Sequence, residues 1–135
     1  MSNASLLRQQ ASRIRVDEVT SSTIDKLLLY RETLDAMADV VEANTLKMTV
    51  GSIGVFLQDV TQVIIGIDDS RDVDPRAKNR ALSELRNAKT ELLLALDHLE
   101  TKQTRSRTYI KCLLNFSQYA RKTANHVEYL RTQIS

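Results

Sequence analysis

The residues of this chain that could do chemistry are few and scattered. Oxygen donors occupy alternate positions from residue 68 to residue 74, which is the spacing of a calcium-binding loop. Such a loop also needs a glycine at its sixth position and a glutamate at its twelfth. This chain has Val73 and Asn79 at those two positions. We therefore interpret the acids as a solvated turn that leads into a helix cap, and we predict no metal site.

The histidines and the cysteine offer no catalytic grouping. His98 and His126 are the only histidines, and they do not have the i, i+4 spacing of a two-histidine metal helix. Cys112 is the only cysteine, so no internal disulfide can form. We interpret it as a small, semi-buried apolar residue. No glycine-rich phosphate loop is present, and we predict neither an enzyme nor a cofactor.

One short motif is compatible with a different activity. Arg121 and His126 are separated by four residues, and this spacing resembles the Arg-x4-His signature of the HEPN ribonucleases. The resemblance implies a helical bundle in which Arg121 holds RNA phosphate and His126 acts as acid or base. Five residues turn a helix by about 140°, so the two side chains diverge unless the helix begins or bends there. We keep this ribonuclease as an alternative hypothesis.

Charge is unevenly distributed along the chain. Residues 17–75 carry a net charge of −8, and residues 76–135 carry a net charge of +7. The stretch 101–127 contains no acid. Either the two halves pack with complementary surfaces, or each presents a charged face to a partner. The second reading predicts a nucleic-acid-binding regulator that uses the basic second half. Its candidate phosphate contacts are Arg105, Arg107, Lys111, Arg121 and Lys122.

The elements that must position these residues are helices. Four stretches carry apolar residues at alternating steps of three and four, which places each set on one side of an α-helix. The four seams are Leu27, Tyr30, Leu34, Met37, Val41 and Met48; Ile53, Phe56, Val60, Val63 and Ile67; Ala81, Leu85, Ala88, Leu92, Ala95 and Leu99; and Leu113, Phe116, Ala120, Thr123, Val127, Leu130 and Ile134. They predict an all-α fold: a four-helix, mostly antiparallel up-and-down bundle with coiled-coil-like packing.

Helix boundaries follow from local signals. The first helix is expected from Ser22 to about Met48, and two nearby glycines predict a turn at 49–52; a kinked continuous helix is the alternative. The second helix is expected over 53–67. The third is expected over 75–100, with Asp74 as N-cap and Pro75 at the first helical position. The fourth is expected from about 106 to the end. Residues 21–135 form the bundle domain, and residues 1–20 form an appendage that is either loose or a short docking helix.

The second helix suggests the function. Val55, Leu57, Ile64 and Ile65 widen its apolar stripe beyond one seam, and a helix that is apolar on most sides is usually central or covered by another subunit. We therefore predict a non-enzymatic interaction or regulatory module that forms a homodimer through these four residues. The stretch 53–67 contains polar residues and is too short to span a bilayer. Without a visible targeting segment, we predict a cytoplasmic protein with no membrane contact.

Overall fold

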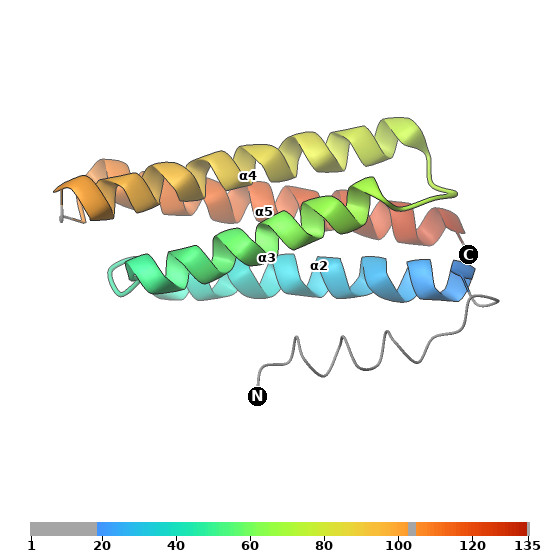
Figure 1. Cartoon of the computed structure of the whole chain (residues 1–135), viewed down its shortest axis with the longest axis horizontal. Helices are drawn as coiled ribbons and strands as arrows, with labels where there is room; N and C mark the ends of the chain where they lie inside the picture. Colours follow the sequence, from blue (N-terminus) through green and yellow to red (C-terminus); the bar gives the residue numbers. More distant parts are fainter. Residues whose placement is uncertain (1–18, 103–104, 135) are drawn as a thin grey trace.

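The computed structural model describes residues 19–102 and 105–134. It contains four helices and no strand in this part of the chain: α2 (Val19–Ala43), α3 (Val50–Asp68), α4 (Pro75–Lys102) and α5 (Arg107–Ile134). The all-α prediction is confirmed, and the four helices form a bundle. Consecutive helices run in opposite directions (Figure 1). The expected appendage lies almost entirely outside the described residues.

The predicted seams form the core. Of the residues in the four seams, all but Tyr30, Phe56 and Ile134 are buried, and those three are half-buried and pack against the core. The periodicity therefore identified the correct face of every helix. Tyr109 and Ala38 are fully buried although the seams did not include them.

The four helices do not share the core equally. Helix α5 packs extensively against both α4 and α2. Helix α3 packs against α4 and makes far less contact with α2. In Figure 1, α3 begins beside the end of α2 and slants toward the start of α4. Helices α2, α4 and α5 thus form the most closely packed part of the bundle, which we call the tight unit. Helix α3 lies against this unit at an angle.

The first connection lies earlier in the chain than predicted. Helix α2 ends at Ala43 rather than near Met48, and α3 begins at Val50 rather than at residue 53. The chain does break here, so the alternative of one kinked helix is wrong. Asn44 ends α2, since its Nδ2 donates to the Val40 carbonyl at 2.8 Å and its own carbonyl accepts from Met48 N at 3.0 Å.

A capping box fixes the start of α3. The Thr49 hydroxyl accepts from Ser52 N at 3.1 Å, and the Ser52 hydroxyl accepts from Thr49 N at 2.8 Å. Two of the N–H groups that a helix start leaves unpaired are thereby satisfied. Both glycines that suggested a turn therefore lie inside α3, where Gly51 is in the first turn.

The second connection agrees with its prediction. Helix α4 starts at Pro75, and the Asp74 carboxylate accepts from Arg76 N at 3.2 Å. Asp72, in the middle of the connection, has a φ of 63°. Asp is among the residues that tolerate this left-handed conformation best after glycine. The acids of this turn therefore cap and shape the chain.

Candidate functional site: the outer face of α3

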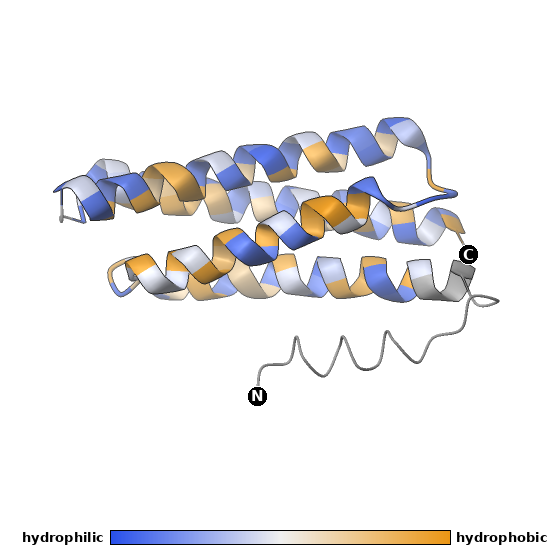
Figure 2. Cartoon of the chain, in the orientation of Figure 1, coloured by the Kyte–Doolittle hydropathy of each residue, from blue (hydrophilic) through white to orange (hydrophobic). Residues whose placement is uncertain are grey.

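The side of α3 that points away from the core carries little charge. We define the outer face of α3 by eight of its exposed and half-exposed residues: Val50, Gly51, Gly54, Val55, Gln58, Thr61, Gln62 and Ile65. The half-buried Asp59 borders this face, where it lines a hollow with Gln58 and Gln62, and the exposed Asp68 ends the helix. Its inner face buries Ile53, Val60, Val63 and Ile67. Hydrophobic residues lie along much of α3, most densely toward its end (Figure 2). The outer face therefore combines apolar side chains, two glycines and neutral polar groups.

The four predicted contact residues divide into two pairs. Val55 is 54% exposed and Ile65 is 48% exposed, so both belong to the outer face. Leu57 and Ile64 are half-buried and pack against the core. Of the four predicted residues, only Val55 and Ile65 are therefore exposed enough for a partner to contact their side chains. Sequence reasoning did not name Gly51, Gly54, Gln58 and Gln62 as part of this face, although the low charge of the helix was visible in the sequence.

Only one ionisable side chain lies within residues 50–67. This residue, Asp59, is half-buried, and burial raises the pKa of its carboxyl above the usual range. The hydroxyl of Thr61 donates to the Leu57 carbonyl at 2.8 Å, so it is satisfied within its own helix. The outer face thus offers mainly neutral polar and apolar groups, with Asp59 at its edge.

Helix α3 also meets the simple criteria for a membrane span. It has 19 residues with a mean hydropathy of 1.6, which is longer than the apolar window expected from the sequence. Core helices of soluble proteins meet the same criteria, and α3 buries one face against the bundle.

Where α3 diverges from α2, an open groove of about 270 Å³ lies between them. Tyr30 reaches from α2 to Gly66 on α3, and a Cβ at Gly66 would overlap the Tyr30 hydroxyl. Burial and the nearby Asp69 carboxylate raise the pKa of Tyr30. The Tyr30 ring therefore packs directly against Gly66, where a larger residue has no room.

Most of the basic residues predicted to contact phosphate lie apart from one another or already interact with another group of the protein. Arg105 donates from Nη2 to the Met48 carbonyl at 2.8 Å, which ties the α2–α3 connection to the start of α5. The Lys122 ammonium lies 5.6 Å from the centre of the Tyr119 ring. Arg107 and Lys111 are exposed and form no ion pair within the described residues.

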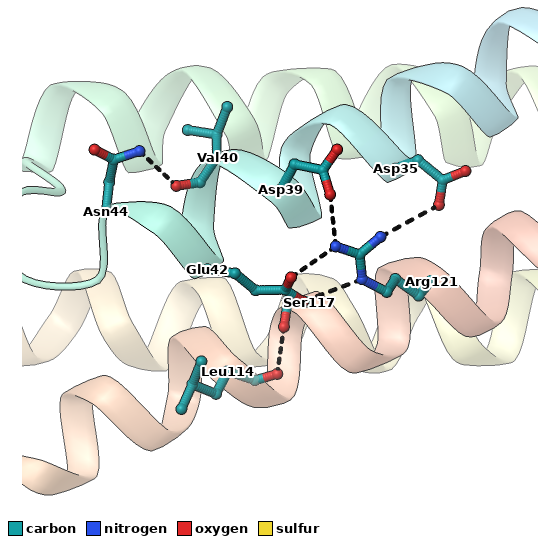
Figure 3. A network of polar contacts seen from close by, with 8 residues as sticks. All are labelled: Asp35, Asp39, Val40, Glu42, Asn44, Leu114, Ser117 and Arg121. Atoms are coloured by element: carbon teal, nitrogen blue, oxygen red, sulfur yellow. Dashed lines mark hydrogen bonds and ion pairs between the residues drawn. The ribbon is translucent and has the colours of Figure 1, made fainter.

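Arg121 is held by carboxylates of α2. Its Nη2 donates to Asp39 Oδ1 and to Glu42 Oε1, each at 2.6 Å, and its Nε donates to Glu42 Oε2 at 3.1 Å. Asp35 lies 3.9 Å from Nη1. Figure 3 shows the guanidinium surrounded by these three acids. Hydrogen bonds from Arg121 lower the pKa of Glu42, and Ser117 adds to this effect.

This arrangement bears on both alternative hypotheses. The Arg121 guanidinium points toward α2 (Figure 3), so a phosphate would have to displace three carboxylates to reach it. His126 is half-buried five residues further along the same helix. The opposite charges of the two halves meet here, which agrees with the reading that the halves pack together.

Cys112 is buried in α5. Burial raises the pKa of its thiol, and the Glu91 carboxylate raises it further. A thiol in this environment is a poor nucleophile. The described residues contain no group of three metal-ligating side chains.

Three comparisons with known proteins found no match for this chain. No family model matches it, and neither the curated proteins nor the solved structures include a match.

Proposed function

We propose that this protein is a non-enzymatic helical interaction module that self-associates through the outer face of α3. The observation that carries the proposal is that Val50, Val55 and Ile65 are each at least 45% exposed on the outer face of α3, among neutral polar residues and glycines. Exposed apolar side chains that gather on one face can mark an interaction site. The other helices expose more charged side chains than α3, although they also expose Val40, Leu93, Leu94, Leu114 and Tyr129.

The proposal includes a packing mode. The seams repeat every seven residues and are buried except at Tyr30, Phe56 and Ile134, and consecutive helices alternate in direction (Figure 1). These features support a mostly antiparallel up-and-down bundle with coiled-coil-like packing. In such a bundle, a fifth helix cannot enter the core, so any partner must bind to an outer face.

Sedimentation of matched charge variants tests the proposal. Ile65 and Leu93 are each 48% exposed, but Leu93 lies on the outer surface of α4. We expect the wild-type chain to dimerise at tens of micromolar. Ile65→Lys should weaken the dimer at least about tenfold, because an unpaired charge would be buried in the contact, and Leu93→Lys should leave it unchanged. A wild-type chain that stays monomeric, or equal effects of the two variants, would contradict the proposal.

A nucleic-acid regulator is the second candidate. The observation in its favour is that Arg107 and Lys111 are exposed near the start of α5 and make no ion pair within the described residues. Such cations can contact phosphates, and their binding weakens steeply with salt. Retention of single-stranded RNA or DNA at low salt, reduced in Arg107→Ala, would support this function. A chain that retains neither would exclude it.

A further inference from the structure

One end of the bundle is basic, and the other is acidic. The α2–α3 and α4–α5 connections lie together at one end, and the α3–α4 connection lies at the opposite end (Figure 1). We call residues 43–54 together with residues 101–102 and 105–111 the basic end, which contains no acid. Its cations are all exposed: Lys47, Lys102, Arg105, Arg107 and Lys111. The opposite connection, residues 68–74, carries four acids and one cation.

The acids nearest to the basic end leave it positive. Glu42 is the last acid before it on α2, and Arg121 holds the Glu42 carboxylate at 2.6 and 3.1 Å. Asp97 and Glu100 precede the basic end on α4 and are exposed. Counting these two acids with the five cations still gives a net charge of +3. The basic end therefore attracts an anionic surface over the Debye length, a distance of about 10 Å at moderate salt.

The connection between α2 and α3 directs one apolar side chain inward and another outward. The Asn44 carbonyl accepts from Lys47 N at 2.9 Å and from Met48 N at 3.0 Å, which closes a tight turn. Met48 is 3% exposed and belongs to the core, whereas Leu46 is 63% exposed. Leu46 is the most exposed large hydrophobic side chain of the described residues. The turn thus presents an aliphatic side chain at the tip of the basic end.

Arg105 joins the two connections into one platform. Its Nη2 donates to the Met48 carbonyl at 2.8 Å, which fixes the start of α5 beside the turn that carries Leu46. Val50, which is 45% exposed, follows in the first turn of α3, and the capping box holds that turn. These hydrogen bonds hold the platform in place without a partner, so binding has a smaller entropic cost.

We propose that the basic end is a docking surface for an anionic lipid bilayer. Its cations contact the headgroup phosphates and carboxylates, and Leu46 and Val50 enter the boundary between the headgroups and the acyl chains. Because charge attraction and apolar burial act together, neither has to be strong by itself. The acidic connection, residues 68–74, then points away from the negative surface. This inference goes beyond the proposed self-association and does not require it.

The residue types favour lipid over nucleic acid. Proteins that bind single strands stack the bases on exposed aromatic side chains. The described residues of the basic end expose none, because Tyr109 is buried. RNA would pair with the cations but leave Leu46 in water, whereas a bilayer surface accommodates both kinds of side chain.

The inference departs from the sequence prediction of no membrane contact. That prediction considered only a stretch that could span a bilayer, and peripheral docking needs no such stretch. The exposure of Leu46 and the closeness of the two connections are properties of the fold. They became visible only when the helices were placed in space.

Vesicle flotation tests the charge requirement. We expect the wild-type chain to float with phosphatidylcholine vesicles that contain about 30% phosphatidylserine, and not with phosphatidylcholine alone. Salt at about 0.5 M should release it. Lys47→Gln should weaken binding about fivefold, which is the contribution of one cation near an anionic surface. Arg86→Gln, which removes an exposed cation in the middle of α4, is the matched control and should bind as the wild type does.

Leu46→Ser tests the apolar contact. It should weaken vesicle binding about tenfold, because it removes apolar burial and leaves the charge unchanged. Leu93→Ser, at a residue that is 48% exposed on α4, should have no effect. Leu46→Ser that binds as tightly as the wild type, or a wild-type chain that binds neither kind of vesicle, would overturn the proposal. A wild-type chain that retains single-stranded RNA but no vesicles would assign the basic end to nucleic acid instead.

A tryptophan reports the environment of residue 46 directly. The chain contains no tryptophan, so Leu46→Trp places the probe at one site, and Leu93→Trp is its control. We expect the fluorescence of Leu46→Trp to shift to shorter wavelength when phosphatidylserine vesicles are added, and that of Leu93→Trp to stay unchanged. Binding without a shift at residue 46 would overturn the proposal.

The test is separable from self-association. Ile65→Lys should weaken the dimer but float at least as well as the wild type. Flotation that is lost in Ile65→Lys and kept in Leu46→Ser would place the lipid contact on the outer face of α3 and overturn this inference. A wild-type chain that stays monomeric in sedimentation but floats with anionic vesicles would remove the proposed self-association and support the docking surface.

Discussion

Helices α5 and α3 bury an apolar seam in different ways. Helix α5 lies between two neighbours, and its partner α2 is held to it by ion pairs of Arg121 with Asp39 and Glu42. Helix α3 packs mainly against α4 and touches α2 lightly, and Asp59 and Asp68 are its only charged side chains. The difference indicates that α2, α4 and α5 contribute most of the packing, and that α3 is held by fewer contacts.

Truncation of a core residue should reveal the largest difference between the two regions. Leu92 on α4 and Ile53 on α3 are both fully buried. We expect Leu92→Ala to lower the free energy of unfolding by about 4–5 kcal/mol and Ile53→Ala by about 2–3 kcal/mol. The costs of such cavities depend on how well the site can collapse, and α3 has fewer neighbours to keep a cavity open.

Urea denaturation of the two variants and the wild type measures this difference. Equal losses would mean that α3 is held as firmly as the tight unit. The comparison between the two regions would then fail.

Glycine replacements should give effects of opposite sign within α3. We expect Gly66→Ala to destabilise the protein by about 1–2 kcal/mol, because the new methyl group would displace the Tyr30 ring. Gly54→Ala should stabilise it by up to about 1 kcal/mol, since its Cβ meets nothing and alanine is the better helix former. Thermal denaturation by circular dichroism gives both shifts. A neutral Gly66→Ala would show that Tyr30 does not need this position.

The smallest effect concerns pH and the Arg121 ion pairs. The pKa of Glu42 is lowered from its ordinary value of 4.5. The stabilisation from this pair is therefore complete above pH 4.5 and is lost as the pH falls through the lowered pKa of Glu42. Both side chains are more than one-third exposed, so we expect at most about 1 kcal/mol.

Arg121→Gln should remove that part of the acid sensitivity. The measurement is the free energy of unfolding at pH 7 and at pH 3 for the wild type and the variant. If both lose the same amount of stability between the two pH values, the ion pair does not couple α2 to α5. The α3 seam contains no group that titrates in this way, so it serves as the neutral reference.

The sequence predicted the helices and their inner faces but not every boundary. Apolar spacing identified the buried side of each helix, because burial and helical period are properties of nearby residues. The end of α2 was misplaced, since Asn44 and the Thr49–Ser52 capping box outweighed the two glycines. An N3 serine is a weaker sequence signal than the glutamate of a standard capping box.

The site was only partly predictable for a different reason. Exposure separates Val55 and Ile65 from Leu57 and Ile64, and exposure depends on which neighbour covers each edge of α3. The partners of Arg121 lie on another helix, about eighty residues earlier in the chain. No local pattern specifies that encounter, although the opposite charges of the two halves indicated it.

These same ion pairs have a consequence for how the chain folds. The contacts of Arg121 with Asp39 and Glu42 join residues 82 and 79 positions apart, so forming them closes nearly the whole bundle into a loop. Closure of a long loop has an entropic cost that contacts between adjacent helices do not have. The α4–α5 hairpin can assemble early, whereas the arginine reaches its acids only when α2 has returned. We therefore expect these ion pairs to form late in folding, after contacts between adjacent helices.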